Sequence, residues 1–239
     1  MPEIDLLHTD CMEYMAGLPD KAFDLAIVDP PYGIGEHGGK RREGPKSFAK
    51  GLVSASYQKK EWDHAIPSGE YFRELARISR NQIIWGGNYF IEHLTATPCF
   101  LVWDKKTSDG SDFADCELAW TSFATAVRKF KYDWIGFGYL NNPHGERKIH
   151  PTQKPVALYR WLLKKYAKPG QRILDTHLGS GSIAIACDLE GFDLVGCEID
   201  ADYIKAARHR LSVHRSQPRL FDATEPRLTE QLSLGDDLL

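Results

Sequence analysis

Short apolar runs alternate with amphipathic segments along most of this chain. Seven of the runs are brief, rich in β-branched or aromatic residues and bounded by turn formers, which is typical of β-strands. They lie at residues 4–7, 23–28, 82–85, 99–103, 117–123, 172–175 and 193–199. The spacing of apolar residues predicts helices within 69–79, 154–170 and 201–213, and a short helix of small residues at 183–187. Strands that alternate with helices predict an α/β fold with a doubly wound, mostly parallel sheet.

Two regions interrupt this alternation. Residues 33–60 are glycine-rich, basic and nearly free of apolar periodicity, and a connection of this length is usually functional or disordered. Residues 128–150 interleave aromatic with basic side chains. We expect a single domain over residues 1–215, followed by an acidic tail at 216–239 that is peripheral or disordered.

Composition adds little beyond excluding some classes of protein. Hydrophobic residues make up 42% and charged residues 26% of the chain, close to the average for globular proteins. No apolar stretch has the length of a membrane helix, and the N-terminal residues lack a secretory pattern, so a cytoplasmic protein is expected. The five cysteines are scattered and form no C-x-x-C pair, which predicts free thiols and no metal site.

The distribution of charge changes the picture given by the net charge of -3. The tail holds two arginines and five acids, which accounts for the whole excess of negative charge. Within the rest, residues 128–172 carry eleven Lys or Arg against two acids, and residues 36–60 carry seven against two. These stretches indicate a phosphate-contacting surface. A solvated charged face is the alternative.

Two predicted strand ends carry candidate ligand-binding residues. Gly179, Ser180 and Gly181 follow the strand at 172–175 and precede a helix, so a ligand could approach the backbone closely there. A tight structural turn would explain the glycines equally well. Glu198 closes a strand about twenty residues later, where such sheets place an acid that binds ribose hydroxyls. The P-loop lysine pattern is absent, which favours an adenosine-type ligand without phosphate over a nucleoside triphosphate.

A third strand end carries the sequence VDPPYGIG at residues 28–35. Asp29 supplies a carboxylate, the prolines remove backbone donors while keeping carbonyl acceptors, and Tyr32 supplies a flat aromatic face. This combination suits a planar group that carries an amine, and a nucleobase is the obvious candidate. The alternative is a rigid turn in which Tyr32 packs into the core.

Three motifs together identify a resemblance to a known family. The sequence resembles the amino-group DNA methyltransferases, with DPPY at 29–32 as their catalytic motif and LDTHLGSGS at 174–182 as their cofactor loop. HPTQKP at 150–155 is similar to the segment that precedes the cofactor loop in the family's β-type motif order. The resemblance runs from about residue 4 to 213, and the middle of the chain is similar to small phage or prophage enzymes. The family usually has Asp-Pro-Phe where Thr176 and His177 follow Asp175 here. His177 is either a packing substitute or a residue that alters cofactor affinity, and we favour packing.

The resemblance implies a Rossmann-like fold and S-adenosylmethionine as the methyl donor. It places Asp10 at the cofactor adenine amine and Glu198 at the ribose, although Asp10 could be an ordinary turn aspartate. The residues implied near the methionine part are Thr152, Gln153, Lys154, Asp175, Gly179, Ser180 and Gly181. Lys154 and Pro155 would also suit the start of a helix.

The implied reaction is methylation of an exocyclic base amine in double-stranded DNA. The base would be extruded from the duplex and stacked on Tyr32, while Asp29 and the Pro30 carbonyl hold its amine for direct attack on the methyl group. An aspartate at the position of Asp29 favours N6-adenine over N4-cytosine in the family. Residues 119–149 are a candidate target-recognition segment, and the candidate phosphate contacts are Arg41, Arg42, Lys46, Arg128, Lys129 and Lys131. Tyr132 and Trp134 are expected in the core.

Other functions compete with this interpretation. An RNA methyltransferase would commonly have asparagine in place of Asp29, and no RNA-binding module is recognised. A decayed module that binds cofactor or nucleic acid without catalysis is a further alternative. Family members are often dimeric, although no interface patch is identified in the sequence. No nuclease pattern is present, so any restriction partner would be a separate chain.

Overall fold

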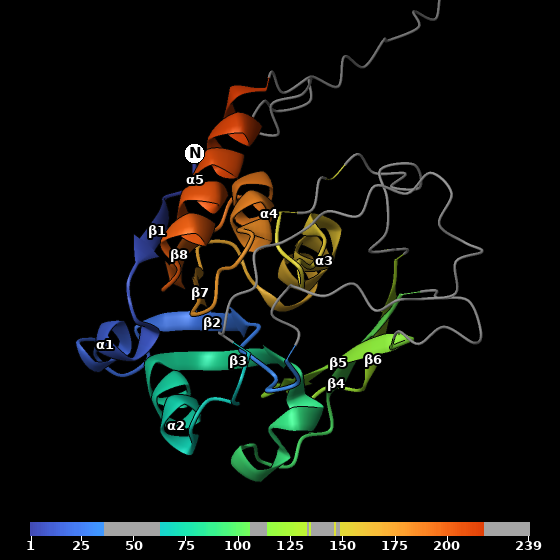
Figure 1. Ribbon diagram of the computed structural model, residues 1–239. Helices are drawn as coiled ribbons and strands as arrows, with labels where there is room; N and C mark the ends of the chain where they lie inside the picture. Colours follow the sequence, from blue (N-terminus) through green and yellow to red (C-terminus); the bar gives the residue numbers. More distant parts are fainter. Residues whose placement is uncertain (36–62, 106–113, 133, 135–145, 147–148, 218–239) are drawn as a thin grey trace, which may run out of the picture.

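The computed structural model describes residues 1–35, 63–105, 114–132, 134, 146 and 149–217. In this part of the chain, eight strands form one sheet (Figure 1). They are β1 (Ile4–His8), β2 (Phe23–Val28), β3 (Ser79–Trp85), β4 (Phe100–Asp104), β5 (Cys116–Thr121), β6 (Arg128–Lys131), β7 (Arg172–Asp175) and β8 (Asp193–Glu198). The helices are α1 (Cys11–Ala16), α2 (Gly69–Ile78), α3 (Val156–Tyr166), α4 (Ser182–Glu190) and α5 (Ala201–Ser216), with short 3₁₀ turns η1 (Gly87–Tyr89) and η2 (Ile91–His93).

The sheet is mostly parallel, as the sequence predicts. Its strand order is β1-β8-β7-β2-β3-β5-β4-β6. The first five strands in this order, from β1 to β3, pair in parallel, and β4 pairs in parallel with β6. Strand β5 is antiparallel to both of its neighbours, β3 and β4. The predicted α/β fold is therefore confirmed, with one reversed strand in the half of the sheet that follows β3.

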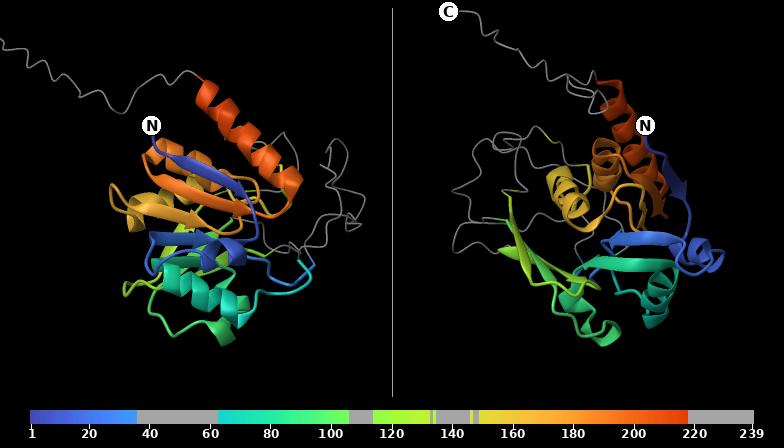
Figure 2. Two further views of the ribbon diagram at one scale, coloured as in Figure 1. Left: turned by 90° about the vertical axis from the view of Figure 1, so that its left-hand side faces the viewer. Right: turned by 180° about the vertical axis from the view of Figure 1, so that it is seen from behind.

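Helices cover both faces of the sheet, with α3, α4 and α5 on one side and α1 and α2 on the other (Figures 1 and 2). The alternation of side chains in β2 explains how one strand supports both layers. Leu25 and Ile27 belong to the cluster that contains α3 and α4 residues. Ala26 and Val28 belong to the cluster that contains α1 and α2 residues. A strand buried on both faces therefore appears in the sequence as an unbroken apolar run.

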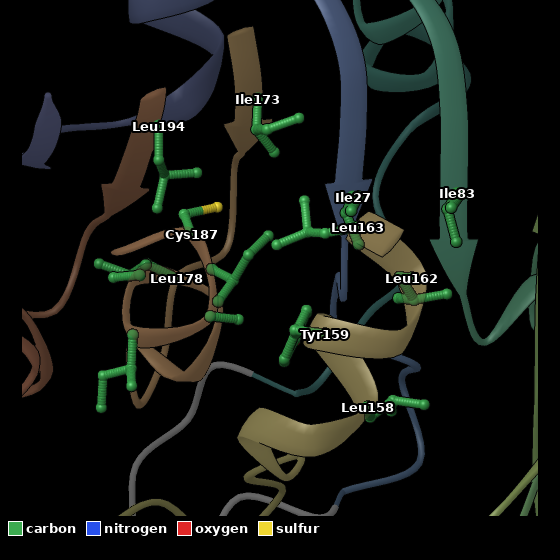
Figure 3. Close-up of a cluster of buried hydrophobic side chains, with 14 of the residues drawn as sticks. Ile27, Ile83, Leu158, Tyr159, Leu162, Leu163, Ile173, Leu178, Cys187 and Leu194 are labelled. Carbon is green, nitrogen blue, oxygen red and sulfur yellow. The ribbon is translucent and has the colours of Figure 1, made fainter. Parts of the chain in front are cut away.

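The larger of the two clusters fixes α3 and α4 against the sheet (Figure 3). Leu158, Leu162 and Leu163 of α3 are fully buried there, facing Ile27 and Ile83 of the central strands. Burying one such side chain contributes roughly 1.5–3 kcal/mol. This packing carries the chain that immediately precedes α3, which includes Lys154, to the carboxyl ends of the central strands.

Two elements were not anticipated from the sequence. Residues 128–131 form strand β6, which pairs with β4 at the edge of the sheet; three of its four residues are exposed, so the strand lacks an apolar alternation. Helix α1 is only six residues long and buries Met15 alone, too little for a periodic pattern. Within the described residues, no helix combines the length and apolar character needed to span a bilayer.

Several predicted features lie outside the described residues. They include most of the basic loop at 33–60, much of the segment 119–149, and the tail from residue 218. The predicted single domain over residues 1–215 therefore stays a prediction.

Candidate functional site

The chain segments that leave adjacent parallel strands form one site. Strand β2 pairs with β3 on one side and β7 on the other, and β8 lies between β7 and β1. Because parallel strands present their carboxyl ends at the same edge, the segments that follow β2, β3, β7, β8 and β1 meet there. Asp29, Gly86 and Asp10 lie in the segments after β2, β3 and β1, and Asp175 and Glu198 are the last residues of β7 and β8.

A buried lysine organises the segment after β2. The Lys154 Nζ lies 2.6 Å from Asp29 Oδ2 and 2.9 Å from Glu117 Oε2, and it donates to the Tyr32 hydroxyl at 3.1 Å. Tyr32 in turn donates its hydroxyl proton to Asp29 Oδ1 at 2.6 Å. Lys105 extends the arrangement outward, with its Nζ 2.6 Å from Glu117 Oε1. Both Asp29 oxygens are therefore fixed, one by a hydroxyl and one by an ammonium group.

These contacts shift the pKa values of the charged groups. Burial raises the pKa of Asp29, and Glu117 raises it further, against the opposing effect of the Lys154 charge. Burial also acts to raise the pKa of Glu117, but Lys154 and Lys105 outweigh it and lower that pKa to about 2. Burial acts to lower the pKa of Lys154, but the carboxylates of Asp29 and Glu117 outweigh it, so the net shift is upward. Glu117 and Lys154 are therefore a charged pair at neutral pH.

The Tyr32 ring is held by the segment that follows β3. It stacks on Tyr89, with the centroids 5.0 Å apart and an angle of 17° between the planes, and it meets Phe90 edge-on. Gly86 adopts a left-handed conformation with φ of 73°. A Cβ atom at Gly86 would come within 2.2 Å of Tyr32 Cε1, so only glycine leaves room for the ring there.

Strand β7 ends with a buried carboxyl group. Asp175 Oδ1 accepts a hydrogen bond from the His177 backbone N–H at 3.0 Å, and burial raises the pKa of Asp175 to about 8. The His177 ring meets Tyr71 edge-on and its Nδ1 lies 2.9 Å from Thr176 Oγ1. Burial lowers the pKa of His177 to about 4, so its imidazole is neutral at pH 7. These contacts support the interpretation of His177 as a packing residue.

The glycine loop is tied to the acid at the end of β8. Gly179 and Gly181 both have positive φ, 50° and 71°. The Gly179 backbone N–H donates to Glu198 Oε2 at 2.8 Å, and the Asp200 N–H donates to Oε1 at 2.9 Å. Burial raises the pKa of Glu198, although these two hydrogen bonds oppose the shift. A Cβ atom at Gly179 would meet only His150, at 3.8 Å, so a ligand could approach the backbone here.

Asp10 lies beside this loop at the end of β1, where His8 pairs with Glu198. Its Oδ1 accepts from the backbone N–H groups of Met12 and Glu13, at 2.7 and 3.3 Å. The residue therefore caps α1, which is the ordinary role weighed for it from the sequence. A carboxylate has about four acceptor positions, so the cap leaves capacity for a ligand amine.

The residues of the HPTQKP segment have different surroundings. Gln153 is almost fully buried and ties down the local backbone, since its Oε1 accepts from the Ile149 N–H and its carbonyl accepts from Trp134 Nε1. Thr152 contacts the His150 ring. Lys154 lies against Asp29, as described above.

In the glycine loop, the remaining predicted residue, Ser180, has its Oγ 3.1 Å from Ser182 Oγ.

The candidate DNA contacts divide into two groups. Arg41, Arg42 and Lys46 lie outside the described residues. Arg128, Lys129 and Lys131 are exposed on the edge strand β6, where Lys129 also lies 3.5 Å from Asp104. Trp134 is buried, and the Tyr132 ring stacks on Phe130, consistent with their expected core positions.

Glu117, Gly86 and Tyr89 belong to the site but were not identified as site residues from the sequence. Glu117 is the acid within the predicted strand at 117–123, and no residue near it in the sequence indicates a partner for its carboxylate. Gly86 and Tyr89 lie in GGNY directly after the third predicted strand. Two glycines at a strand end, followed two residues later by a tyrosine, indicate a segment in which another group approaches the backbone closely. This pattern could have placed the segment at the site.

Comparison with known proteins identifies relatives over most of the chain. YubD of Escherichia coli (strain K12), a methylase by name, is 27% identical over 213 residues that cover 86% of this chain and 89% of that protein. The Type II methyltransferase M.HinfI of Haemophilus influenzae is 24% identical, over 89% of this chain and 69% of its own length.

Solved structures share the fold at lower identity. The M1.HpyAVI-SAM complex has a TM-score of 0.54 at 20% identity and covers 87% of this chain and all of its own. The cytosine-N4-specific PvuII DNA methyltransferase has a TM-score of 0.58 at 11% identity, over 93% of this chain and 89% of its own. A family model described as DNA methylase matches residues 80–209. Since this match spans more than half of the chain, the protein belongs to the N6/N4 DNA methylase family.

Proposed function

We propose that this protein transfers the methyl group of S-adenosylmethionine to the N6 amine of an adenine extruded from double-stranded DNA. The observation that carries the proposal is the position of Asp29 and Tyr32 at the end of β2, next to the glycine loop that follows the adjacent strand β7. Membership of the N6/N4 family supports an amino group as the acceptor, and the aspartate at position 29 favours adenine.

The residues at the ends of β7, β8 and β1 suit the cofactor. S-adenosylmethionine supplies an electrophilic methyl group on a positively charged sulfur. Glu198 would accept hydrogen bonds from the ribose hydroxyls, and Asp10 from the adenine amine. The backbone at Gly179 is approachable, and Asp175 ends the strand that precedes the glycine loop. Thr152, Gln153 and Ser180 would complete the surroundings of the methionine part.

The residues at the end of β2 suit the acceptor amine. Tyr32 and Lys154 occupy one acceptor position on each Asp29 oxygen, which leaves about two of the four positions for amine protons. With the Pro30 carbonyl as a second acceptor, the nitrogen lone pair would point at the methyl carbon. Acceptors fixed in advance stabilise the positive charge that develops on the amine during attack. No covalent enzyme intermediate is needed.

The DNA has to deliver a single base to this site. Extruding a base costs on the order of a few kcal/mol, and stacking on the Tyr32 ring would offset part of that cost. Arg128, Lys129 and Lys131 would contact phosphates from β6, together with Arg41, Arg42 and Lys46. Phosphate contacts increase affinity without reading sequence.

The test is incubation of the protein with methyl-labelled S-adenosylmethionine and unmethylated duplex DNA, with RNA in parallel, followed by nucleoside digestion and mass analysis. Label in 6-methyladenine is the expected result. Label in 4-methylcytosine would refute adenine as the target, label in RNA alone would refute DNA as the substrate, and the absence of label with intact cofactor binding would leave a binding module.

Replacing the proposed acceptor carboxylate tests its role separately. The Asp29→Ala variant should lose methylation while it still binds S-adenosylmethionine in calorimetry. Retained turnover would refute the assignment of Asp29.

A further inference from the structure

Charged groups of alternating sign form a continuous row behind the acceptor site. Starting at the more exposed end, the row runs from Lys105 to Glu117, Lys154 and Asp29, with successive N···O distances of 2.6, 2.9 and 2.6 Å. The side chain of Lys154 is only 2% exposed, while Asp29, Lys105 and Glu117 are 14%, 20% and 22% exposed. The row is therefore buried most deeply at Lys154, between the two carboxylates.

The two residues of the outer half come from the β4–β5 part of the sheet. Lys105 directly follows β4, and Glu117 is the second residue of β5. Their backbones are paired on adjacent strands, since Asp104 is opposite Cys116 and Trp103 is opposite Glu117. Glu117 is thus held on a rigid element, as a residue that positions another group needs to be.

Three groups lie within 3.1 Å of the Lys154 ammonium nitrogen. An ammonium group has three N–H bonds, and Lys154 has three partners: Asp29, Glu117 and the Tyr32 hydroxyl. Two carboxylates therefore share one buried cation. If Glu117 were absent, the same ammonium group would be paired with Asp29 and a hydroxyl alone.

We propose that Glu117 is a positioning residue of methyl transfer, because it holds the Lys154 ammonium between two carboxylates and so orients Asp29 without neutralising it completely. This inference rests on the proposed function, since it concerns the same acceptor site. Lys154 then has two effects on Asp29. It fixes one oxygen of the carboxylate, and it reduces the negative charge available to the amine. Glu117 opposes the second effect and preserves the first.

The physical reason lies in where charge moves during the reaction. The positive charge on the donor sulfur is transferred to the base amine, which lies against Asp29 in the proposed site. A carboxylate paired exclusively with a lysine attracts that developing charge weakly, because the pair is neutral overall. A second carboxylate 2.9 Å from the same lysine restores negative potential at Asp29. Groups that stabilise charge only as it develops increase kcat rather than substrate affinity.

The pH dependence of activity distinguishes a positioning role of Glu117 from a merely structural one. The charged and titratable groups that interact with Asp29 come from six parts of the fold. They are Tyr32 after β2, Tyr71 of α2, Glu117 of β5, Lys154 before α3, Tyr159 of α3 and Asp175 of β7. Removing the Glu117 charge lowers the pKa of Asp29, whereas removing the Lys154 charge raises it. The acid limb of the pH–activity profile is the range in which activity falls on acidification. It should therefore move in opposite directions in the two variants, whereas a change that only reduced the rigidity of the site would move it in neither.

The experiment compares Glu117→Gln and Lys154→Met with the unchanged protein. Steady-state methylation of DNA is measured across pH, with calorimetric binding of S-adenosylmethionine and thermal unfolding for each variant. We expect E117Q to lower kcat by roughly 10- to 100-fold, by analogy with the loss of residues that orient metal ligands, while cofactor affinity stays nearly constant. The acid limb of kcat/KM, which reports the free enzyme, should move to lower pH in E117Q and to higher pH in K154M.

Glu190→Gln is the matched control. Glu190 also binds two cations, since its Oε1 lies 2.6 Å from Arg160 Nε and 3.4 Å from Lys164 Nζ, but it ends α4, away from the acceptor site. E190Q should keep both kcat and the pH profile of the unchanged protein. If E117Q behaves like E190Q in an active enzyme, or if the two acid limbs move in the same direction, the inference is wrong.

A second variant covers the case in which E117Q does not fold. Lys105→Met removes the outer partner of Glu117 from a side chain that is partly exposed. Because a positive charge is lost from the row, the acid limb should move to higher pH, by less than in K154M. An unmoved limb would overturn the inference. Failure of the unchanged protein to methylate any DNA would instead refute the proposed function.

Discussion

Replacing Gly86 by alanine should inactivate the protein while leaving it folded. Gly86 lies directly after β3, with φ of 73°, and packs against Tyr32 of the proposed acceptor site. A Cβ atom there would lie 2.2 Å from Tyr32 Cε1, 2.6 Å from Cδ1 and 2.8 Å from Cζ. All three atoms belong to the ring on which the target base would stack, so the substitution acts directly on the acceptor site.

Two separate effects determine the expected magnitude. A non-glycine residue in the left-handed region costs about 1–2 kcal/mol, and a domain of this size loses about 2–4 °C in Tm for each kcal/mol. Moving the ring from 2.2 Å to an ordinary contact of 3.4 Å requires a shift of about 1.2 Å. Since misplacement by about 1 Å can cost about 100-fold in rate, we expect kcat to fall by about two orders of magnitude.

Gly170→Ala separates these two effects. Gly170 has φ of 81°, and a Cβ atom at this position would meet nothing within 4 Å. It therefore carries the backbone strain without displacing any ring. Methylation rates, cofactor binding and thermal unfolding should be measured for both variants. Both variants should lose stability, G86A by at least as much as G170A because the displaced ring adds to the backbone strain, and only G86A should lose kcat. Equal activity in the two would refute the reasoning that the position of Tyr32 limits the reaction.

Two further predictions concern the cofactor side of the site. Burial raises the pKa of Asp175 to about 8, so between its ordinary pKa of about 3.9 and that value the folded state keeps a proton that the unfolded state releases. This proton should make stability fall as pH rises, by at most about 1.4 kcal/mol per pH unit. Asp175→Asn should reduce the slope by that contribution in thermal unfolding without cofactor, and an unchanged slope would contradict the raised pKa. Glu198→Gln should weaken S-adenosylmethionine binding about tenfold or more, because a hydrogen bond to a charged group contributes about 1.5–3 kcal/mol. Calorimetry measures this loss, and unchanged affinity would exclude Glu198 from the ribose contact.

Much of the site could be predicted because its residues directly follow apolar runs. The strands at 23–28 and 172–175 were located with the bounds that the structure gives them. A strand buried on both faces appears in the sequence as a continuous apolar run, and parallel strands bring their carboxyl ends together. Asp29, Asp175 and Glu198 could therefore be assigned to one edge of the sheet before any coordinates were known.

The edge of the sheet was harder to predict for a local reason. Strand β6 has the sequence RKFK and buries only part of Phe130, so its residues read as a basic segment. Its backbone pairing with β4 produces the strand, and no periodicity records that pairing. The short helix α1 is not predicted from the sequence for the same reason, since its position depends on contacts with α2 rather than on its own apolar face.

The sequence by itself determined the order of elements, the loops that carry the chemistry and the family resemblance, because each depends on residues that are neighbours in the chain. Only the tertiary structure decided which charges meet. Lys154 lies 122 positions after Tyr32 yet donates to its hydroxyl, and Glu117 reaches the same ammonium group from a different strand. Ion pairs in a buried site depend on packing between distant segments, and the spacing of charges along the chain contains no record of that packing.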